Sequence, residues 1–111
     1  MADKVYVGRR KTSVARVILR NGNGNITIGK KSFEQFFPMD VHREDILKPF
    51  QLTDTVGKYD VLINVKGGGI SGQAEAVRLG ISIGLITINP DFRGVLKAEG
   101  FLTRDSRMVE R

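Results

Sequence analysis

The sequence of 111 residues contains no cysteine and no tryptophan, and its one histidine is His42. Without cysteine the chain has no disulfide, no thiolate metal site and no cysteine nucleophile, and one histidine cannot build a multi-histidine metal site. Its apolar runs fall short of the roughly 20 residues of a membrane span, and the opening residues MADKVYVG lack the apolar core of a secretory signal. We therefore expect a cytoplasmic protein with no membrane partner, no metal and no cofactor.

Aromatic and acidic side chains are few, and positive charge is concentrated at one end of the chain. The sequence has two tyrosines and six phenylalanines, and its 18 Lys and Arg outnumber its 12 Asp and Glu. Eight of these cations fall in residues 1–31 beside a single acid, Asp3, whereas the remaining residues are nearly balanced. Such asymmetry predicts a polyanionic partner, foremost a nucleic acid, bound through charge and backbone rather than aromatic stacking. The alternative is a solvated basic face that aids solubility.

The first half of the chain carries three local structural signals. The sequence NGNG at residues 21–24, between two β-branched stretches, predicts a hairpin turn because Asn-Gly supplies positive φ angles. The sequence SFEQ at residues 32–35 has the spacing of a capping box, which predicts a short helix that Pro38 ends. A second short helix is expected from about Asp40 to just before Pro49.

The second half predicts one strand and one long helix. Strict alternation of apolar and polar side chains over residues 59–66 indicates a strand with one buried face. Over residues 70–88 apolar side chains recur at helical spacing on more than one side, which predicts a helix between a sheet and another helix or a partner. The dipeptide NP at residues 89–90 predicts a further helix, which Gly100 ends. Because no repeat or linker divides it, the chain is expected to form one α+β domain, residues 1–111.

The segment from Gly8 to Ser13 is the main candidate for nucleic-acid binding. Three adjacent cations after a glycine can meet several phosphates, and two hydroxyl groups add short hydrogen bonds. Further along, Arg16 and Arg20 project on the same side of their strand. The alternatives are a nuclear-import-like address or a solvated edge that prevents strand aggregation. The candidate ligands in this region are Arg9, Arg10, Lys11, Thr12, Ser13, Arg16, Arg20, Lys30 and Lys31.

A glycine loop at residues 67–72 matches the dinucleotide pattern G-x-G-x-x-G. A dinucleotide fold also needs a second parallel strand that ends in an acid, and here Asp91 follows Pro90 at the expected start of another helix. A phosphate loop is excluded because Gln73 follows the last glycine where lysine is required. The loop can still hold an RNA phosphate at the helix N-terminus, or it can be a tight turn without a ligand. Its candidate ligands are Lys66, Gly67, Gly68, Gly69, Ser71 and Gln73.

The sequence offers little for catalysis. Glu44 and Asp45 are adjacent on a short helix and point in different directions, so they do not form an acid–base pair. His42 has Asp40 and Ser32 nearby in sequence, but their spacing matches no known arrangement of a nucleophile and its base. We therefore expect His42 to be a surface histidine and the protein not to be an enzyme.

Five stretches together resemble a known family. They are GRRKTSVARV at residues 8–17, the GNGNITI segment, KSFEQFF, VLINVKGGGISGQAEAVRLGI at residues 61–81, and LKAEGFLTRDSRMVER at residues 96–111. In this order they cover nearly the entire chain, and they are similar to small-subunit ribosomal protein nine of the bacterial type.

The resemblance implies a structural RNA-binding protein in the head of the small ribosomal subunit, near the P site for tRNA. It implies a two-layer fold with a mixed sheet covered by helices and a left-handed βαβ crossover, as in the second domain of ribosomal protein five. The implied partners are the 3′ major domain of the small-subunit rRNA and neighbouring head proteins. Besides the cations already named, the resemblance adds Arg78, Arg104 and Arg107 as RNA-binding residues, and Arg111 is the last candidate of the set.

Two features depart from the family pattern. The family continues with a basic tail that reaches toward the P-site tRNA, whereas this chain stops at Arg111, so tRNA contact is expected only where such a tail exists. Relatives also commonly place Arg and Ala where Ile83 and Gly84 stand. The isoleucine of this chain makes that helix face more apolar than in the relatives. The alternatives to a ribosomal protein, in the cytoplasm or an organelle, are a free nucleic-acid-binding regulator and a nucleotide-binding enzyme that uses the glycine loop.

Overall fold

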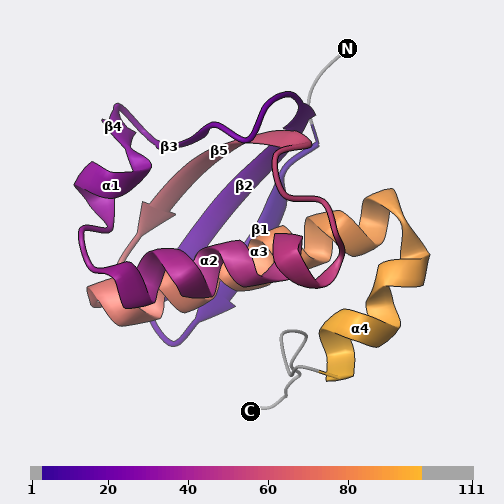
Figure 1. Cartoon of the computed structure of the whole chain (residues 1–111). Coiled ribbons are helices and arrows are strands. Elements are labelled where there is room, and N and C mark those ends of the chain that lie inside the picture. Colours follow the sequence, from indigo (N-terminus) through magenta and orange to yellow (C-terminus); the bar gives the residue numbers. More distant parts are fainter. Residues whose placement is uncertain (1–3, 99–111) are drawn as a thin grey trace.

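The computed structural model describes residues 4–98, which form a five-stranded sheet and the helices packed on it (Figure 1). Along the sheet the strand order is β1-β2-β5-β3-β4. The strands are β1 (Tyr6–Arg10), β2 (Ser13–Asn21), β3 (Ile26–Ile28), β4 (Lys31–Ser32) and β5 (Tyr59–Lys66). The helices are α1 (Phe33–Phe36), α2 (Asp40–Leu52), α3 (Ile70–Ile88), the 3-10 turn η1 (Pro90–Phe92) and α4 (Arg93–Ala98).

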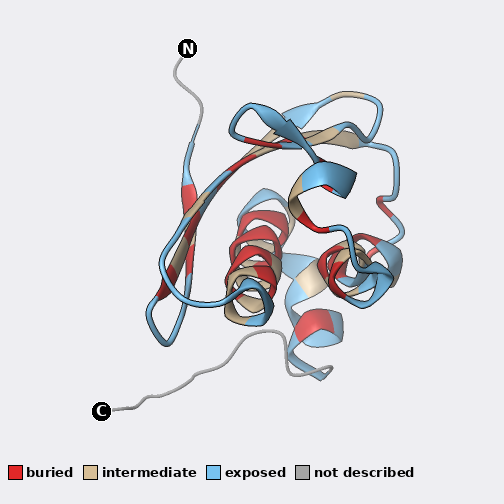
Figure 2. Ribbon diagram, turned by 90° about the vertical axis from the view of Figure 1, so that its left-hand side faces the viewer, coloured by how far each residue is buried: buried red, intermediate tan, exposed pale blue. Residues whose placement is uncertain are grey.

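The sheet is mixed, and the helices lie on its concave side (Figure 2). Strand β5 pairs antiparallel with β2 and parallel with β3, while β1 and β4 pair antiparallel at the two edges. Because β3 and β5 are parallel neighbours, the chain between them crosses through α1 and α2. The expected α+β sandwich is confirmed, and the left-handed sense of the crossover stays a prediction.

The prediction of a hairpin at residues 21–24 is wrong, because β5 lies between β2 and β3, the two strands that this loop joins. The loop passes around the start of β5, where Asp60 Oδ1 accepts hydrogen bonds from the backbone N–H groups of Asn23 and Asn25, at 2.9 and 3.1 Å. Strands β2 and β3 still run in opposite directions, as in a hairpin, but they stand one strand apart. The Asn-Gly signal therefore marked a turn correctly and its partner strands wrongly.

The true two-residue hairpin lies inside the basic run. Strand β1 pairs with β2 in a register that sets Arg10 opposite Ser13, so Lys11 and Thr12 form the turn. Lys11 has φ 55°, a left-handed conformation that non-glycine residues seldom adopt. The turn therefore presents the densest cationic segment at the end of a rigid ribbon. We call residues 9–12 the hairpin tip.

Helix α1 begins as predicted, whereas α2 extends further than predicted. The Ser32 side chain accepts from Gln35 N while the Gln35 side chain accepts from Ser32 N, which is the capping box. Helix α2 does not stop before Pro49 but continues to Leu52. A proline in the last turn removes only one helical hydrogen bond, and Pro49 is fully buried with its carbonyl bonded at 2.9 Å by Thr53 Oγ1.

Helix α3 packs against β1 and β2 on one side and against α2 on the other, as its apolar surface predicted. Glycines allow this close packing. A Cβ atom on Gly8 would lie 2.1 Å from the Ala76 carbonyl oxygen, and one on Gly80 would lie 2.9 Å from Val17 Cγ2. Gly84, one of the departures from the family pattern, makes room for the ring of Tyr6 in the same way.

Asn89 caps η1 as expected, because its side chain accepts from Asp91 N at 3.0 Å. The turn leads into α4, and the expected helix end at Gly100 lies outside the described residues. In the part of the chain that the structure describes, no helix has the length and apolar character to cross a membrane.

Candidate nucleic-acid interface

The hairpin tip and the glycine loop meet at one end of the sheet, although they are more than 50 residues apart in sequence. Val14 stands opposite Lys66 in the β2–β5 register, so β5 delivers the loop beside the turn. Ser13 Oγ then donates a 3.0 Å hydrogen bond to the carbonyl oxygen of Gly67, and Gln73 Nε2 donates one of 3.1 Å to the same atom. Two of the segments predicted to bind nucleic acid are therefore one structural unit.

Glycine is required at 67 and 68 by this packing. Gly67 and Gly68 have φ +79° and +68°, and Cβ atoms there would lie 2.3 Å from the Thr12 carbonyl oxygen and 2.2 Å from Ser13 Oγ. Gly69 differs, because nothing lies within 4 Å of its Cβ position and it forms the N-cap of α3 without a side-chain cap. The turn interpretation thus explains the first two glycines, whereas packing does not require glycine at position 69.

The dinucleotide interpretation of this loop meets a topological obstacle. Within residues 4–98 the helix after the loop leads to η1 and α4, not to a second parallel strand. The ribose-binding acid of that fold has no strand to carry it here. Over the same residues, no three histidine or acidic side chains gather into a group that could hold a metal ion.

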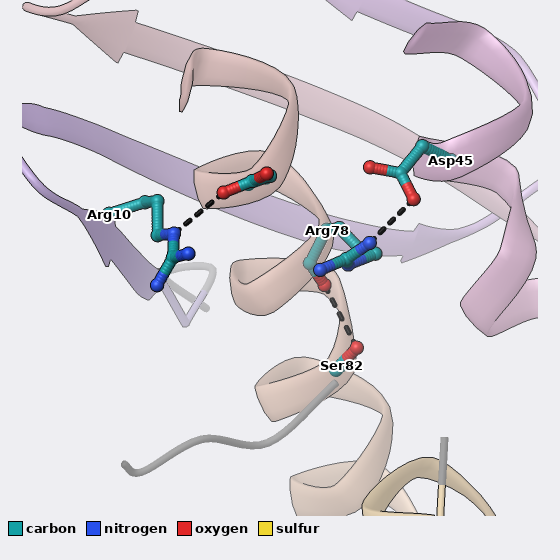
Figure 3. Close-up of polar contacts among 5 residues, drawn as sticks. Arg10, Asp45, Arg78 and Ser82 are labelled. Atoms are coloured by element: carbon teal, nitrogen blue, oxygen red, sulfur yellow. Dashed lines mark hydrogen bonds and ion pairs between the residues drawn. The ribbon is translucent and has the colours of Figure 1, made fainter. Parts of the chain in front are cut away.

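Three cations at this end of the sheet are exposed and have no ion-pair partner within residues 4–98. They are Arg9 and Lys11 of the hairpin tip and Lys66 at the end of β5. Arg10 points to the other side of β1, where its Nε lies 2.6 Å from Glu75 Oε1 of α3 (Figure 3). The structure thus separates the basic run into side chains available to a ligand and one that ties β1 to α3.

The remaining predicted cations are spread over the sheet. Arg16 and Arg20 are exposed on the convex side of β2, as the strand alternation predicted. Lys30 in the turn between β3 and β4 and Lys31 at the start of β4 are exposed, at the opposite edge of the sheet from the hairpin tip. Arg104, Arg107 and Arg111 lie outside the described residues.

Arg78 contacts a neighbouring helix. Its Nη1 lies 2.5 Å from Asp45 Oδ1, with only 23% and 30% of the two side chains exposed, and Ser82 Oγ donates to its carbonyl oxygen (Figure 3). This ion pair joins α3 to α2. The sequence predicts that Asp45 does not form an acid–base pair with Glu44. In the structure Asp45 is the ion-pair partner of Arg78.

The hydroxyl-bearing residues of the predicted site differ in their exposure. Thr12 is exposed at the tip, whereas Ser13 is buried and acts by holding Gly67. Ser71 is exposed at the start of α3, with its Oγ 3.2 Å from His42 Nε2. A nucleic acid at this end can meet Thr12 and Ser71 directly, and Ser13 only through the loop it positions.

His42 is buried, so the prediction that it lies at the surface is wrong. Only 9% of the residue is exposed, and its ring packs edge-on against Phe37. A sequence signal for this burial exists: His42, Ile46, Pro49 and Phe50 share helical spacing, and all four are buried.

The comparisons with known proteins agree on one family. Residues 8–111 match the family described as ribosomal protein S9/S16. A small ribosomal subunit protein uS9 from Amoebophilus asiaticus is 58% identical over 105 residues, which cover 95% of this chain and 82% of the relative. The proteins of the same name from Syntrophobacter fumaroxidans and Mycoplasmopsis synoviae are 52% and 51% identical, covering 100% and 95% of this chain and 87% and 80% of those relatives. This chain belongs to the ribosomal protein S9/S16 family.

Proposed function

We propose that this protein is a noncatalytic structural constituent of the small ribosomal subunit and binds rRNA with the hairpin tip and the adjoining end of β5. The observation that carries the proposal is the cluster of Arg9, Lys11 and Lys66, exposed and without ion-pair partners within residues 4–98. Cations held on a rigid ribbon neutralise phosphates without losing much conformational freedom. The family membership and the relatives' name support the ribosome as the place of binding.

The finer assignment follows the family resemblance. We place the protein as one domain, residues 1–111, in the head of the small subunit, on the 3′ major domain of the rRNA and beside other head proteins in the cytoplasm. Contact with P-site tRNA needs a basic tail after Arg111. Thr12, Ser71, Arg16, Arg20, Lys30 and Lys31 extend the proposed RNA surface, whereas Ser13 and the first two loop glycines support it from within.

The test removes charge without disturbing the fold. Lys11→Gly keeps the positive φ that the turn needs, and Arg9→Gln and Lys66→Gln keep long polar side chains. The control is Lys58→Gln, because Lys58 is exposed just before β5, at the opposite end of that strand from Lys66. We expect the triple variant to bind small-subunit rRNA more weakly and the slope of log K against log salt to fall by about one for each phosphate that the variant no longer neutralises.

Cosedimentation checks the ribosomal part. In a sucrose gradient of a cell lysate, the tagged wild type should move with small subunits at low salt and be stripped at high salt. A wild-type chain that sediments as free protein in both conditions refutes a ribosomal role and favours a free regulator. A triple variant with unchanged rRNA affinity and salt slope refutes the tip as the interface.

A further inference from the structure

The convex face of the sheet carries an unusual set of side chains. In Figure 2 the helices fill the concave side, and within residues 4–98 no element covers the convex side. Strand alternation and register set the convex side chains of β1, β2 and β5 in rows across the sheet. We call them the outer face: Val7, Arg9, Val14, Arg16, Ile18, Arg20, Asp60, Leu62, Asn64 and Lys66, with Thr27 of β3.

Part of the outer face is apolar. Val7, Val14, Ile18 and Leu62 are only half-buried, and no helix packs on them. Ile18 and Leu62 stand opposite each other and line a shallow hollow of about 300 Å³ between β2, β3 and β5. A sheet face that meets only water normally carries polar side chains at these positions, and apolar residues gathered on a surface mark an interaction site.

The charge of the outer face selects the partner. Arg9, Arg16 and Lys66 lie in rows next to the aliphatic side chains and have no ion-pair partner within residues 4–98. The acid of this face, Asp60, already accepts hydrogen bonds from the 22–25 loop. A partner must therefore bring negative charge together with groups that pack on valine, isoleucine and leucine. The sugar-phosphate backbone of RNA provides both.

The form of the RNA follows from what the outer face does not carry. Proteins that bind single strands stack the bases on aromatic rings. Tyr6 and Tyr59, the tyrosines of the described strands, alternate with the outer-face residues and face the helices. No aromatic ring is therefore available on the outer face. A double-stranded A-form helix instead offers a wide, shallow minor groove lined with 2′-hydroxyl groups, which is recognised by shape.

We propose that the outer face docks along the minor groove of an A-form RNA helix. Val14, Ile18 and Leu62 pack on riboses in the groove, Thr27 and Asn64 bond 2′-hydroxyl groups, and Arg16 meets a phosphate at the groove margin. The sheet is convex toward this shallow groove, so the two surfaces are complementary in shape. The inference rests on the proposed rRNA binding. It extends that RNA surface from the hairpin tip along the convex face of the sheet and names the form of RNA bound there.

Directed cleavage from single cysteines tests this placement, because the natural chain has no cysteine to compete for the label. We would attach an iron–EDTA group to Thr27→Cys on the outer face, Thr12→Cys at the tip and Val41→Cys on α2, all at exposed positions. Each labelled chain is then assembled into small subunits. From position 27 we expect rRNA cuts on both strands of one helix, offset across its minor groove, and from position 41 we expect none of these cuts.

The other outcomes each decide between the two proposals. Cuts from position 12 with none from position 27, or cuts from position 27 only in unpaired RNA, overturn the outer-face inference and leave the proposed function standing. A partner protein cleaved from position 27 in place of RNA overturns it as well. If the unlabelled wild type does not enter small subunits, the proposed function fails and the inference falls with it.

A binding measurement without a label gives a second test. The variants are Arg16→Gln, which removes the charge, and Ile18→Thr, which introduces another residue that is common in strands. Val41→Thr on α2 is the control for Ile18→Thr, because it also replaces an aliphatic side chain by threonine but lies on the helical side. On an RNA duplex of about 16 base pairs we expect each outer-face variant to weaken binding several-fold and Val41→Thr to leave it unchanged. If the wild type bound a single RNA strand of the same length as tightly as it binds the duplex, the inference would be overturned.

Discussion

The Ser13 hydroxyl group donates a 3.0 Å hydrogen bond to the Gly67 carbonyl oxygen and so joins the hairpin tip to the glycine loop. Gln73 Nε2 donates to the same oxygen at 3.1 Å, from the first turn of α3. One carbonyl therefore links β2, the loop and the helix. The relative positions of Lys11 and Lys66, and with them the shape of the basic cluster, depend on these two bonds.

We expect Ser13→Ala to lower the free energy of unfolding by about 1 kcal/mol, the usual contribution of one hydrogen bond. Gln73→Ala should cost less, because its hydrogen bond to Gly67 lies at the exposed surface whereas Ser13 is buried. The double variant should lose more than the two single variants together, because Gly67 then loses both of these donors. Urea unfolding of the four proteins in a double-mutant cycle checks this, and strictly additive effects would contradict it.

Gly68 and Gly69 offer a matched pair of substitutions. Gly68→Ala places Cβ 2.2 Å from Ser13 Oγ at φ +68°, so we expect a loss of about 2 kcal/mol or more. Gly69→Ala meets nothing within 4 Å and should cost less than about 1 kcal/mol. Thermal unfolding compares them. Equal losses would show that the loop is not held by the hairpin.

The Arg78–Asp45 ion pair should stabilise the contact between α2 and α3. Because both side chains are partly buried, we expect a coupling of about 1 kcal/mol between Arg78→Met and Asp45→Asn. Urea unfolding measures the coupling, and a value near zero would remove the structural role. The rRNA salt slope of Arg78→Met is the companion measurement: an unchanged slope assigns Arg78 to helix packing, and a fall of about one adds a phosphate contact.

The pH dependence of stability should carry the signature of Asp60. Hydrogen bonds from the backbone N–H groups of Asn23 and Asn25 hold the pKa of this carboxyl below its ordinary value of 3.8. Folding therefore favours the deprotonated form. The resulting stabilisation is complete above the ordinary pKa and is lost as the pH falls through the lower pKa of the folded state.

Asp60→Asn tests this, because the amide oxygen can still accept from both N–H groups but does not titrate. Urea unfolding from about pH 7 to about pH 2.5 should show that the wild type loses stability faster than the variant below about pH 4. Parallel curves over that range would contradict the prediction.

Local patterns predicted several elements well. The alternation over residues 59–66 became β5, the helical spacing over 70–88 became α3, and the SFEQ capping box opened α1. Each signal depends on residues a few positions apart, so the sequence contains everything that is needed. The separation of Arg16 and Arg20 from the core side of β2 follows from the same alternation.

Strand partners could not be predicted in this way. The NGNG loop suits a hairpin, but the choice between pairing β2 with β3 and inserting β5 between them depends on contacts with Asp60, more than 30 residues away. The hairpin at Lys11 and Thr12 was missed because it uses a lysine at positive φ, where glycine or asparagine is the usual signal.

The family, the main strand and helices and the one-sided charge can be predicted from the amino-acid sequence alone, because they depend on residue types and short spacings. Which cations are available to a ligand depends on how the elements pack in three dimensions. This packing pairs Arg10 with Glu75 and Arg78 with Asp45, leaves Arg9, Lys11 and Lys66 exposed together, and buries His42 against Phe37. The physical reason is that the exposure of a charge depends on the elements that pack beside it, and these come from distant parts of the chain.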